Sequence, residues 1–313
     1  MLAHVIAGVA LDVRVIWMGR RILVSGLCQA GPVASALQVL FPNDEFTAMH
    51  QPGHDDDAGV ATLISQLIGK DVWLRYMDHN SLTNRQDVRI HLDGLQTIDV
   101  PMIHFTAFHP DICGVRSLAK GRGIEPQVHS SIVAWAWRNR LPRSQVPKLF
   151  NRDAFAALGY FDHWNGDVAE LKRHFDWCGL DFERFFLRAK RNGVMMHTTA
   201  HPTVHTITSF ARVLALKMGA GPNVMEFPIP INDTFAGLIT WPVYPEIGDY
   251  HAVPSSYVWV INRRSYDLDA YIQYSYERFE KESDGPDDLR PVIGHTWDQT
   301  FDRTLAKHAR SLV

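Results

Sequence analysis

Short apolar segments alternate with helical patterns between residues 20 and 110, and this alternation constrains the fold most. Ile22–Ser25 is an apolar run that ends at Gly26, and a helical pattern with proline in its first turn begins near Pro32. Further strands are predicted at Glu45–Gln51, Asp71–Met77 and Val100–Phe108, and a further helix at Ala58–Ile68. Strands that alternate with helices form βαβ units, so we predict an α/β fold with a mainly parallel sheet and flanking helices.

From about residue 126 the pattern becomes mainly helical. Apolar residues recur at helical spacing in the ranges 128–139, 166–178, 181–191, 202–218, 267–283 and 297–311. Residues 221–256 are rich in proline, which favours irregular loops. Because the chain has no internal repeat and no low-complexity linker, we predict a single domain over residues 1–313. Its α/β half covers about 20–125 and carries Cys28, and its helical, loop-rich half covers about 126–313.

The composition excludes several classes of protein. With 46% hydrophobic and 21% charged residues, the chain is too apolar to be disordered. Its net charge of -3 at pH 7 gives no basic field for nucleic acid, so we expect no nucleic-acid partner. No apolar stretch reaches the length of about 18 residues that a transmembrane helix needs. We expect residues 1–18 to form an N-terminal arm and not a signal peptide, because a basic leader and a cleavage site are missing.

The three cysteines, Cys28, Cys113 and Cys178, are widely spaced and form no CxxC pair. This pattern predicts neither a disulfide framework nor a cysteine-rich zinc site. Free cysteines are typical of a reducing compartment, so we expect a cytoplasmic protein.

Cys28 lies just after the first predicted strand and just before the first predicted helix, in the segment SGLCQAG. Backbone N–H groups point outward at a helix start, where the helix dipole stabilises a thiolate. The same N–H groups can bind an oxyanion, together with the side-chain amide of Gln29. Cys28 is therefore a candidate nucleophile. The alternative is a small buried residue at a tight turn.

Two histidines lie where predicted elements end. His109 follows the strand predicted at 100–108, and Asp111 lies two residues later, so this pair can provide a base and its orienting carboxylate. The alternative is a turn formed by Pro110 and Asp111. In the segment HTTAHPTVH, His201 precedes a proline that disfavours a helix. We therefore expect strand, turn and helix there, with His201 at the junction as a second candidate base.

Other possible sites have simpler explanations. The histidines at 197, 201 and 205 would share a helical face only without Pro202, so we expect no metal there. His50, His54 and Asp55–Asp57 can be explained by an acidic helix N-terminus. Lys120–Gly123 is a small basic patch that can contact phosphate, but the P-loop, GxGxxG, GxSxG and HExxH motifs are absent.

The segments SGLCQAGPVASAL, FTAFHPD and HTTAHPTVH resemble the WcbI family of polysaccharide biosynthesis proteins in order and spacing over most of residues 20–220. The family's signature is a Gly-Asn-Cys-Gln tetrad after the first strand. Here the tetrad reads Gly26-Leu27-Cys28-Gln29, so Leu27 replaces the asparagine, and Gln29 and backbone amides are left as oxyanion donors. The resemblance implies an SGNH/Rossmann-like α/β fold, with Gly26 and Gln29 in the oxyanion or cofactor-binding site.

The resemblance also implies the substrates and the reaction. The donor would be acetyl-CoA, with coenzyme A as product, and the acceptor a capsular or surface polysaccharide sugar or its precursor. Cys28 would be the nucleophile, His201 or His109 the base, and Asp111 the orienter of the base. Direct attack of the sugar on acetyl-CoA remains an alternative to an acetyl-Cys28 intermediate. Two further alternatives are an esterase or thioesterase on the same scaffold and a non-catalytic coenzyme A-binding protein that works with other capsule biosynthesis proteins.

Overall fold

The computed structural model describes residues 19–50, 57–76, 85–293 and 298–310. Its central element is a four-stranded sheet in the order β2-β1-β3-β4. The strands are β1 (Arg21–Gly26), β2 (Glu45–His50), β3 (Val72–Tyr76) and β4 (Gln96–Val100). Every neighbouring pair in this sheet is parallel, which confirms the predicted mainly parallel sheet.

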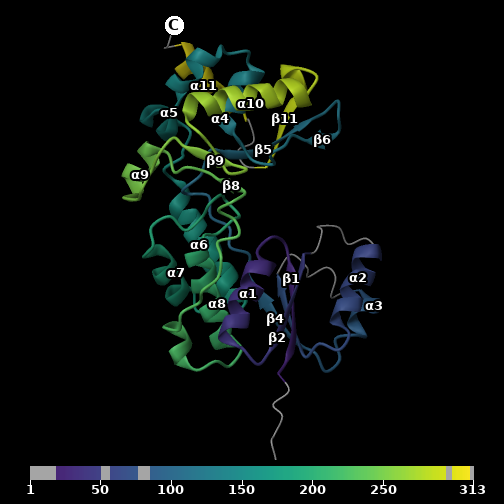
Figure 1. The fold of residues 1–313 in the computed structure, drawn as a ribbon. Helices are drawn as coiled ribbons and strands as arrows, with labels where there is room; N and C mark the ends of the chain where they lie inside the picture. The colour runs from purple at the N-terminus through teal and green to yellow at the C-terminus, as the bar shows by residue number, and fades with distance from the viewer. Residues whose placement is uncertain (1–18, 51–56, 77–84, 294–297, 311–313) are drawn as a thin grey trace, which may run out of the picture.

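Helices cover both faces of this sheet (Figure 1). On one side lie α1 (Ala30–Leu40) and α8 (Val204–Lys217), and on the other α2 (Asp57–Leu67) and α3 (Gln86–Arg89). Ile22 and Val24 of β1 belong to the core that includes α1, whereas Leu23 belongs to a second core that includes α2. The burial of both faces explains why β1 is a continuous apolar run in the sequence.

The fourth strand lies earlier than predicted. β4 covers Gln96–Val100, whereas the sequence pattern predicts a strand over Val100–Phe108. Phe105 and Phe108 are buried, but the Phe105 N–H donates to the Thr199 carbonyl of a loop, at 2.9 Å. An apolar run indicates burial without specifying its partner. Here the run leaves the sheet and packs beneath other parts of the chain.

The second half is mainly helical, as predicted. Its α-helices are α4 (Ser131–Arg138), α5 (Arg152–Ala157), α6 (His163–Trp177), α7 (Phe182–Lys190), α8, α9 (Pro245–His251), α10 (Leu268–Glu282) and α11 (Gln299–Arg310). The short 3-10 helices are η3 (Arg143–Leu149), η4 (Pro222–Met225) and η5 (Pro286–Asp288). The predicted helix ranges agree with these bounds to within a few residues.

Small antiparallel sheets, which the sequence pattern did not predict, complete the fold. One contains β5 (Ile112–Ser117), β6 (Arg122–Gly123), β7 (His129–Ser130) and β11 (Leu289–Ile293). The other contains β8 (Ile239–Thr240), β9 (Trp259–Ile261) and β10 (Arg264–Tyr266). Many of these strands have only two or three residues, too few to show an alternating pattern in the sequence.

Candidate active site

Cys28 lies in the turn that connects β1 to α1. Gly26 precedes this turn, and a Cβ atom at that position would lie 2.5 Å from Cδ2 of Tyr76. The absence of a side chain therefore lets the end of β1 approach the Tyr76 ring. Packing accounts for Gly26, and its predicted oxyanion or cofactor role stays a prediction.

The Cys28 thiol is partly buried, and burial raises its pKa above the ordinary value. Hydrogen bonds from the backbone N–H groups of Cys28 and Gln29 act in the opposite direction but do not compensate for the burial. The sequence pattern predicted a stabilised thiolate, whereas the structure favours a neutral thiol at pH 7. Activation of Cys28 therefore requires a base. The same two N–H groups remain candidates for binding an oxyanion.

The side-chain amide of Gln29 is fully buried and binds the protein itself. Its Nε2 donates to the Ile103 carbonyl at 2.7 Å and to the Ala200 carbonyl at 2.9 Å, and its Oε1 accepts from the Ile103 N–H at 3.1 Å. Both amide hydrogens are thus already donated, so the predicted oxyanion contact does not fit this side chain. Gln29 instead fastens the Cys28 turn to two distant segments.

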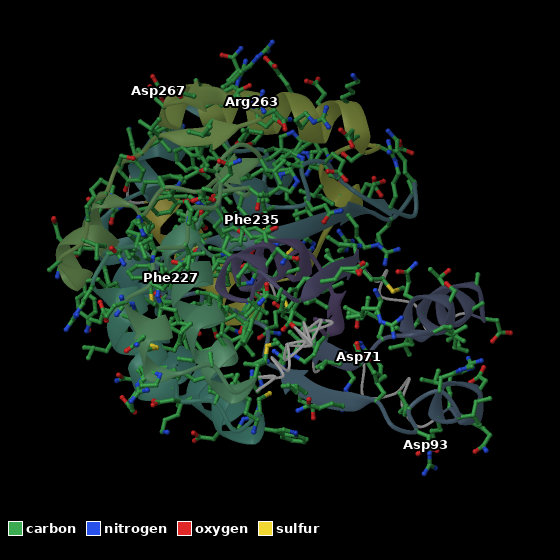
Figure 2. The ribbon with its side chains drawn as sticks, turned by 60° about the horizontal axis from the view of Figure 1, so that its bottom comes forward. Asp71, Asp93, Phe227, Phe235, Arg263 and Asp267 are labelled. Atoms are coloured by element: carbon green, nitrogen blue, oxygen red, sulfur yellow. The ribbon has the colours of Figure 1, made fainter. Side chains whose placement is uncertain are left out.

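A cavity of about 610 Å³ opens at Cys28. α1 contributes Pro32 to its wall, β2 contributes Phe46, and the loop before β8 contributes Phe235. Figure 2 labels Phe235 near α1, residues of which line the same cavity. This volume lies within the range of about 300–1,000 Å³ that is typical of small-molecule sites. Cys28 therefore faces a space that can hold a ligand.

His201 stacks on Phe235, which lines this cavity, with ring centroids 4.7 Å apart and an angle of 10° between the rings. The Ala200 carbonyl, one residue earlier, is held by Gln29, so the structure brings the Cys28 turn and the His201 segment together. Burial and the nearby His197 lower the pKa of His201, so the ring is neutral at pH 7. Its Nδ1 is buried and forms no hydrogen bond within the described part of the chain, and its role as a base stays a prediction.

His197 and Asp233 form a second pair that the sequence pattern did not reveal. His197 Nε2 lies 2.9 Å from Asp233 Oδ2. Asp233 also accepts hydrogen bonds from the N–H groups of Val204 and Phe235, at 3.1 and 3.3 Å. Burial raises the pKa of Asp233, but these hydrogen bonds together lower it by more, so the pKa lies below its ordinary value. This carboxylate therefore fixes the loop that places Phe235 against His201. In the sequence, the position of Asp233 in the proline-rich range 221–256 indicates a turn but no histidine partner.

His109 is buried and is not among the residues that line the Cys28 cavity; it lines a second cavity instead. Its Nε2 lies 3.0 Å from the Met196 carbonyl and its Nδ1 lies 3.3 Å from the Pro242 carbonyl. Burial lowers the pKa of His109 to about 4, so the ring is neutral. Both nitrogens thus contact backbone carbonyls, and which histidine acts as the base stays a prediction.

Asp111 does not orient His109. Its buried carboxylate accepts hydrogen bonds from the Tyr160 and Tyr244 hydroxyls, at 2.8 and 2.7 Å, and from the Ile132 N–H at the start of α4, at 3.0 Å. Burial raises the pKa of Asp111 to about 6 despite these bonds. The predicted Cys28–His109–Asp111 arrangement is therefore not formed among the described residues, and Asp111 connects α4 to the loops that pack on it.

The histidines at 197, 201 and 205 do not converge. Met196 and Pro202 form an isolated β-bridge, and α8 starts only at Val204, with the Thr203 side chain as its cap. Pro202 thus separates the strand-like part from the helix, as predicted. Within the described ranges, no group of three or more histidine, cysteine or acidic residues can hold a metal. His54 and its acidic neighbours at 55 and 56 lie outside these ranges, as do residues 1–18.

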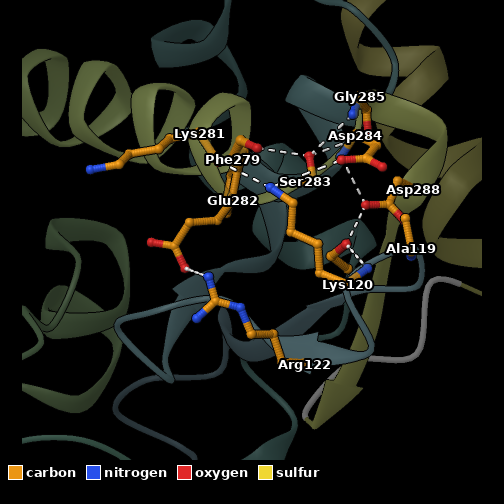
Figure 3. Close-up of polar contacts among 11 residues, drawn as sticks. Ala119, Lys120, Arg122, Phe279, Lys281, Glu282, Ser283, Asp284, Gly285 and Asp288 are labelled. Carbon is orange, nitrogen blue, oxygen red and sulfur yellow. Dashed lines mark hydrogen bonds and ion pairs between the residues drawn. The ribbon is translucent and has the colours of Figure 1, made fainter.

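The basic segment Lys120–Gly123 contacts acidic partners instead of facing the Cys28 cavity (Figure 3). Lys120 Nζ lies 3.9 Å from Asp284 and also donates to the Lys281 carbonyl at 3.2 Å, and Arg122 lies 4.0 Å from Glu282. Carboxylates at the end of α10 and beyond therefore balance this patch, and the structure gives no support for a phosphate contact there.

These observations describe an α/β protein with a cysteine at the first strand–helix turn, a ligand-sized cavity at that cysteine and an imidazole stacked on one wall residue of the cavity. Residues 21–223 match the family described as polysaccharide biosynthesis enzyme WcbI, and the chain belongs to this family. The family match confirms the resemblance read from the sequence. No curated protein matches the chain.

One solved structure gives the fold independently. It is described as WcbI, a polysaccharide biosynthesis enzyme, in its native form without a disulfide bond between coenzyme A and a cysteine. Its TM-score is 0.65 at 18% identity, over 94% of this chain and 98% of that chain. This likeness confirms the fold class.

In the described ranges, no helix combines the length and the apolar character needed to cross a bilayer.

Proposed function

We propose that the protein is an acetyl-CoA-dependent O-acetyltransferase that acts on a hydroxyl of a capsular or surface polysaccharide sugar, through an acetyl-Cys28 intermediate. The observation that carries this proposal is the position of Cys28 in a ligand-sized cavity, one wall residue of which, Phe235, stacks on the neutral imidazole of His201. Small and apolar side chains, among them Ala34, Ala48 and Phe235, line this cavity and suit a pantetheine arm. The description of the WcbI structure names coenzyme A and a cysteine together, which supports the same pairing here.

In the first half-reaction, His201 takes the proton of the Cys28 thiol, and the sulfur attacks the thioester carbonyl of acetyl-CoA. The N–H groups of Cys28 and Gln29, which point at the sulfur, lie where they can donate to the oxyanion. The carbon–sulfur bond to coenzyme A then breaks. Coenzyme A leaves with the proton from His201, and the acetyl group remains on Cys28.

In the second half-reaction, His201 takes the proton of a sugar hydroxyl, and the oxygen attacks the acetyl carbonyl. The bond to Cys28 breaks, and its sulfur recovers the proton from His201. The product is the O-acetylated sugar. We place this reaction in the cytoplasm, where the acceptor is a polysaccharide or its precursor and the partners are other capsule biosynthesis proteins.

The test is a single-turnover incubation with isotopically labelled acetyl-CoA, an acid quench and peptide mapping by mass spectrometry. We expect the label on Cys28 and none in Cys28→Ser, while Cys178→Ala, a change at another buried cysteine, keeps it. His201→Asn should slow acetylation by about 10²–10⁴-fold without weakening coenzyme A binding, because only proton transfer is lost. In the wild type, the rate should fall only below pH 6.5, since the pKa of His201 is lowered from that value.

Three outcomes would overturn the proposal in different ways. Transfer that continues in Cys28→Ser with no label on the enzyme would indicate direct attack on acetyl-CoA. Release of acetate without any acceptor requirement would indicate a thioesterase. Coenzyme A binding without turnover, unaffected by Cys28→Ser and His201→Asn, would indicate a non-catalytic binding protein.

A further inference from the structure

A second cavity of about 460 Å³ lies near the Cys28 site and has no role in the reaction as described so far. Its walls come from the segment that follows β4, from the ends of α5 and α6, and from α11. Polar residues that line it include His104, Thr106, His163, Thr199, Asp298 and Thr304. The volume is within the range of about 300–1,000 Å³ found for small-molecule sites.

The side chains of this cavity are hydrogen-bonding groups with little charge. Burial lowers the pKa values of His104 and His163, so both rings are neutral at pH 7. Asp298 is the single carboxylate, and no lysine or arginine is among the lining residues that the structure describes. Such a wall suits a ligand with many hydroxyl groups and no phosphate, because an anionic ligand would find no cation there.

Hydrogen bonds fix the orientation of one of these rings. Thr106 Oγ1 lies 3.0 Å from Asp167 Oδ2 and 2.8 Å from His163 Nδ1. The hydroxyl has one proton and an ionised carboxylate only accepts, so the hydroxyl donates to Asp167 and His163 Nδ1 donates to the hydroxyl. The Nε2 of neutral His163 is then an acceptor. Neutral imidazoles and threonine hydroxyls in one wall supply both hydrogen-bond donors and acceptors, as the hydroxyl groups of a sugar require.

Apolar groups complete this lining. Phe301, Leu158 and Ile112 also line the cavity. A sugar ring has C–H faces between its hydroxyl groups, so a site that recognises it combines apolar surface with a few polar groups.

The cavity is connected to Cys28 through Gln29. The Gln29 amide binds Ile103, whose neighbour His104 lines the cavity, and it also binds the Ala200 carbonyl. Thr199, on one side of Ala200, lines the same cavity, while His201, on the other side, stacks on Phe235 of the Cys28 cavity. The 199–201 segment therefore lines one space through Thr199 and contacts a wall residue of the other through His201.

We infer that this second cavity is the acceptor subsite, which binds one uncharged pyranose ring of the polysaccharide while the Cys28 cavity holds the acetyl donor. This inference rests on the proposed acetyl transfer for its place in the reaction. Binding of the sugar itself does not depend on that reaction, so the two can be tested separately.

The test uses two tryptophan variants on α5. Ala156 and Ala157 are both exposed, but only Ala157 lines the cavity, so Ala157→Trp obstructs the cavity and Ala156→Trp is its matched control. The probes are a panel of uncharged methyl glycosides, and their binding to the full-length protein is followed by saturation-transfer NMR. We expect at least one glycoside to bind the wild type and Ala156→Trp, and Ala157→Trp to weaken that binding about tenfold or more.

A smaller variant provides a second measurement. Thr304→Val keeps the volume of the side chain and removes one hydroxyl group, so it should weaken the same glycoside by about two- to tenfold. Thermal unfolding of each variant checks that the fold is intact. Equal binding to wild type and Ala157→Trp, or no binding by any glycoside, would overturn the assignment.

The outcomes also separate this inference from the proposed function. Glycoside binding that depends on position 157, in a protein that is never acetylated on Cys28, would support the saccharide site and refute the transfer. Acetylation of Cys28 with glycoside discharge unaffected by Ala157→Trp would support the transfer and refute the subsite.

Discussion

Replacement of Gln29 by leucine tests whether this side chain assembles the site. The substitution keeps a similar volume but removes the three hydrogen bonds to Ile103 and Ala200. Two carbonyl groups and one N–H group then lose their partner. Each buried polar group without a partner costs roughly 1–3 kcal/mol, and because the contact to Ala200 is only partly buried, we expect a total near the lower end, about 3 kcal/mol. For a chain of 313 residues this corresponds to a fall in Tm of about 5 °C.

The same helix offers a matched control. Gln38 has the same pattern of contacts: its amide nitrogen donates to the Phe41 and Asp44 carbonyls, and its oxygen accepts from the Phe46 N–H. Gln38→Leu should therefore also lower the free energy of unfolding. It should leave the Cys28 turn in place, because these contacts lie at the other end of α1, although Gln38 and Phe46 also line the Cys28 cavity.

The assay combines urea unfolding with the rate at which iodoacetamide alkylates Cys28. Gln29→Leu should accelerate alkylation by about three- to tenfold, because release of the turn exposes the thiol and relieves the burial that raises its pKa. Gln38→Leu should not change the rate. A loss of less than about 1 kcal/mol in Gln29→Leu, with an unchanged alkylation rate, would refute the view that Gln29 holds the site together.

Three further predictions concern stability. Burial raises the pKa of Asp111 from 3.8 to about 6, so the folded protein holds this proton more tightly than the unfolded chain, and the free energy of unfolding should fall by about 3 kcal/mol as pH rises from 4 to 6. In urea titrations Asp111→Asn should not show this fall. Parallel pH profiles of the two proteins would contradict the prediction. Gly26→Ala should lower the free energy of unfolding by about 1–3 kcal/mol, because the added Cβ would meet the Tyr76 ring. Gly31→Ala should raise it by up to about 1 kcal/mol, because no atom lies within 4 Å of the added Cβ. Equal melting temperatures for the two variants would argue against this packing. A hydrogen bond from the Ser117 hydroxyl lowers the pKa of Asp288 to about 2, so the ionised carboxylate stabilises the fold above pH 3.8, and this contribution disappears as pH falls through 2. In calorimetry Asp288→Asn should melt below the wild type at pH 7 and together with it near pH 2. A difference in melting temperature that does not change with pH would refute the assignment.

The site was only partly predictable from the sequence. The position of Cys28 follows from local signals, namely the apolar run of β1, the glycine after it and the proline in the first turn of α1. The pattern did not reveal Asp233, because a lone aspartate in a proline-rich loop shows no sign of the histidine it contacts 36 positions away. The pattern also favoured a pairing of His109 with Asp111, because the two residues lie only two positions apart in the sequence.

The sequence by itself determined the parallel sheet, the helical second half and the turn that carries Cys28, because these depend on periodicity and on residues a few positions apart. Only the tertiary structure decided which histidine packs on the wall of the Cys28 cavity and whether the thiol is charged. Gln29 binds partners 74 and 171 positions away, and no local pattern encodes such contacts. The pKa of Cys28 depends on how much of the thiol those distant segments bury, and that burial exists only once the chain has folded.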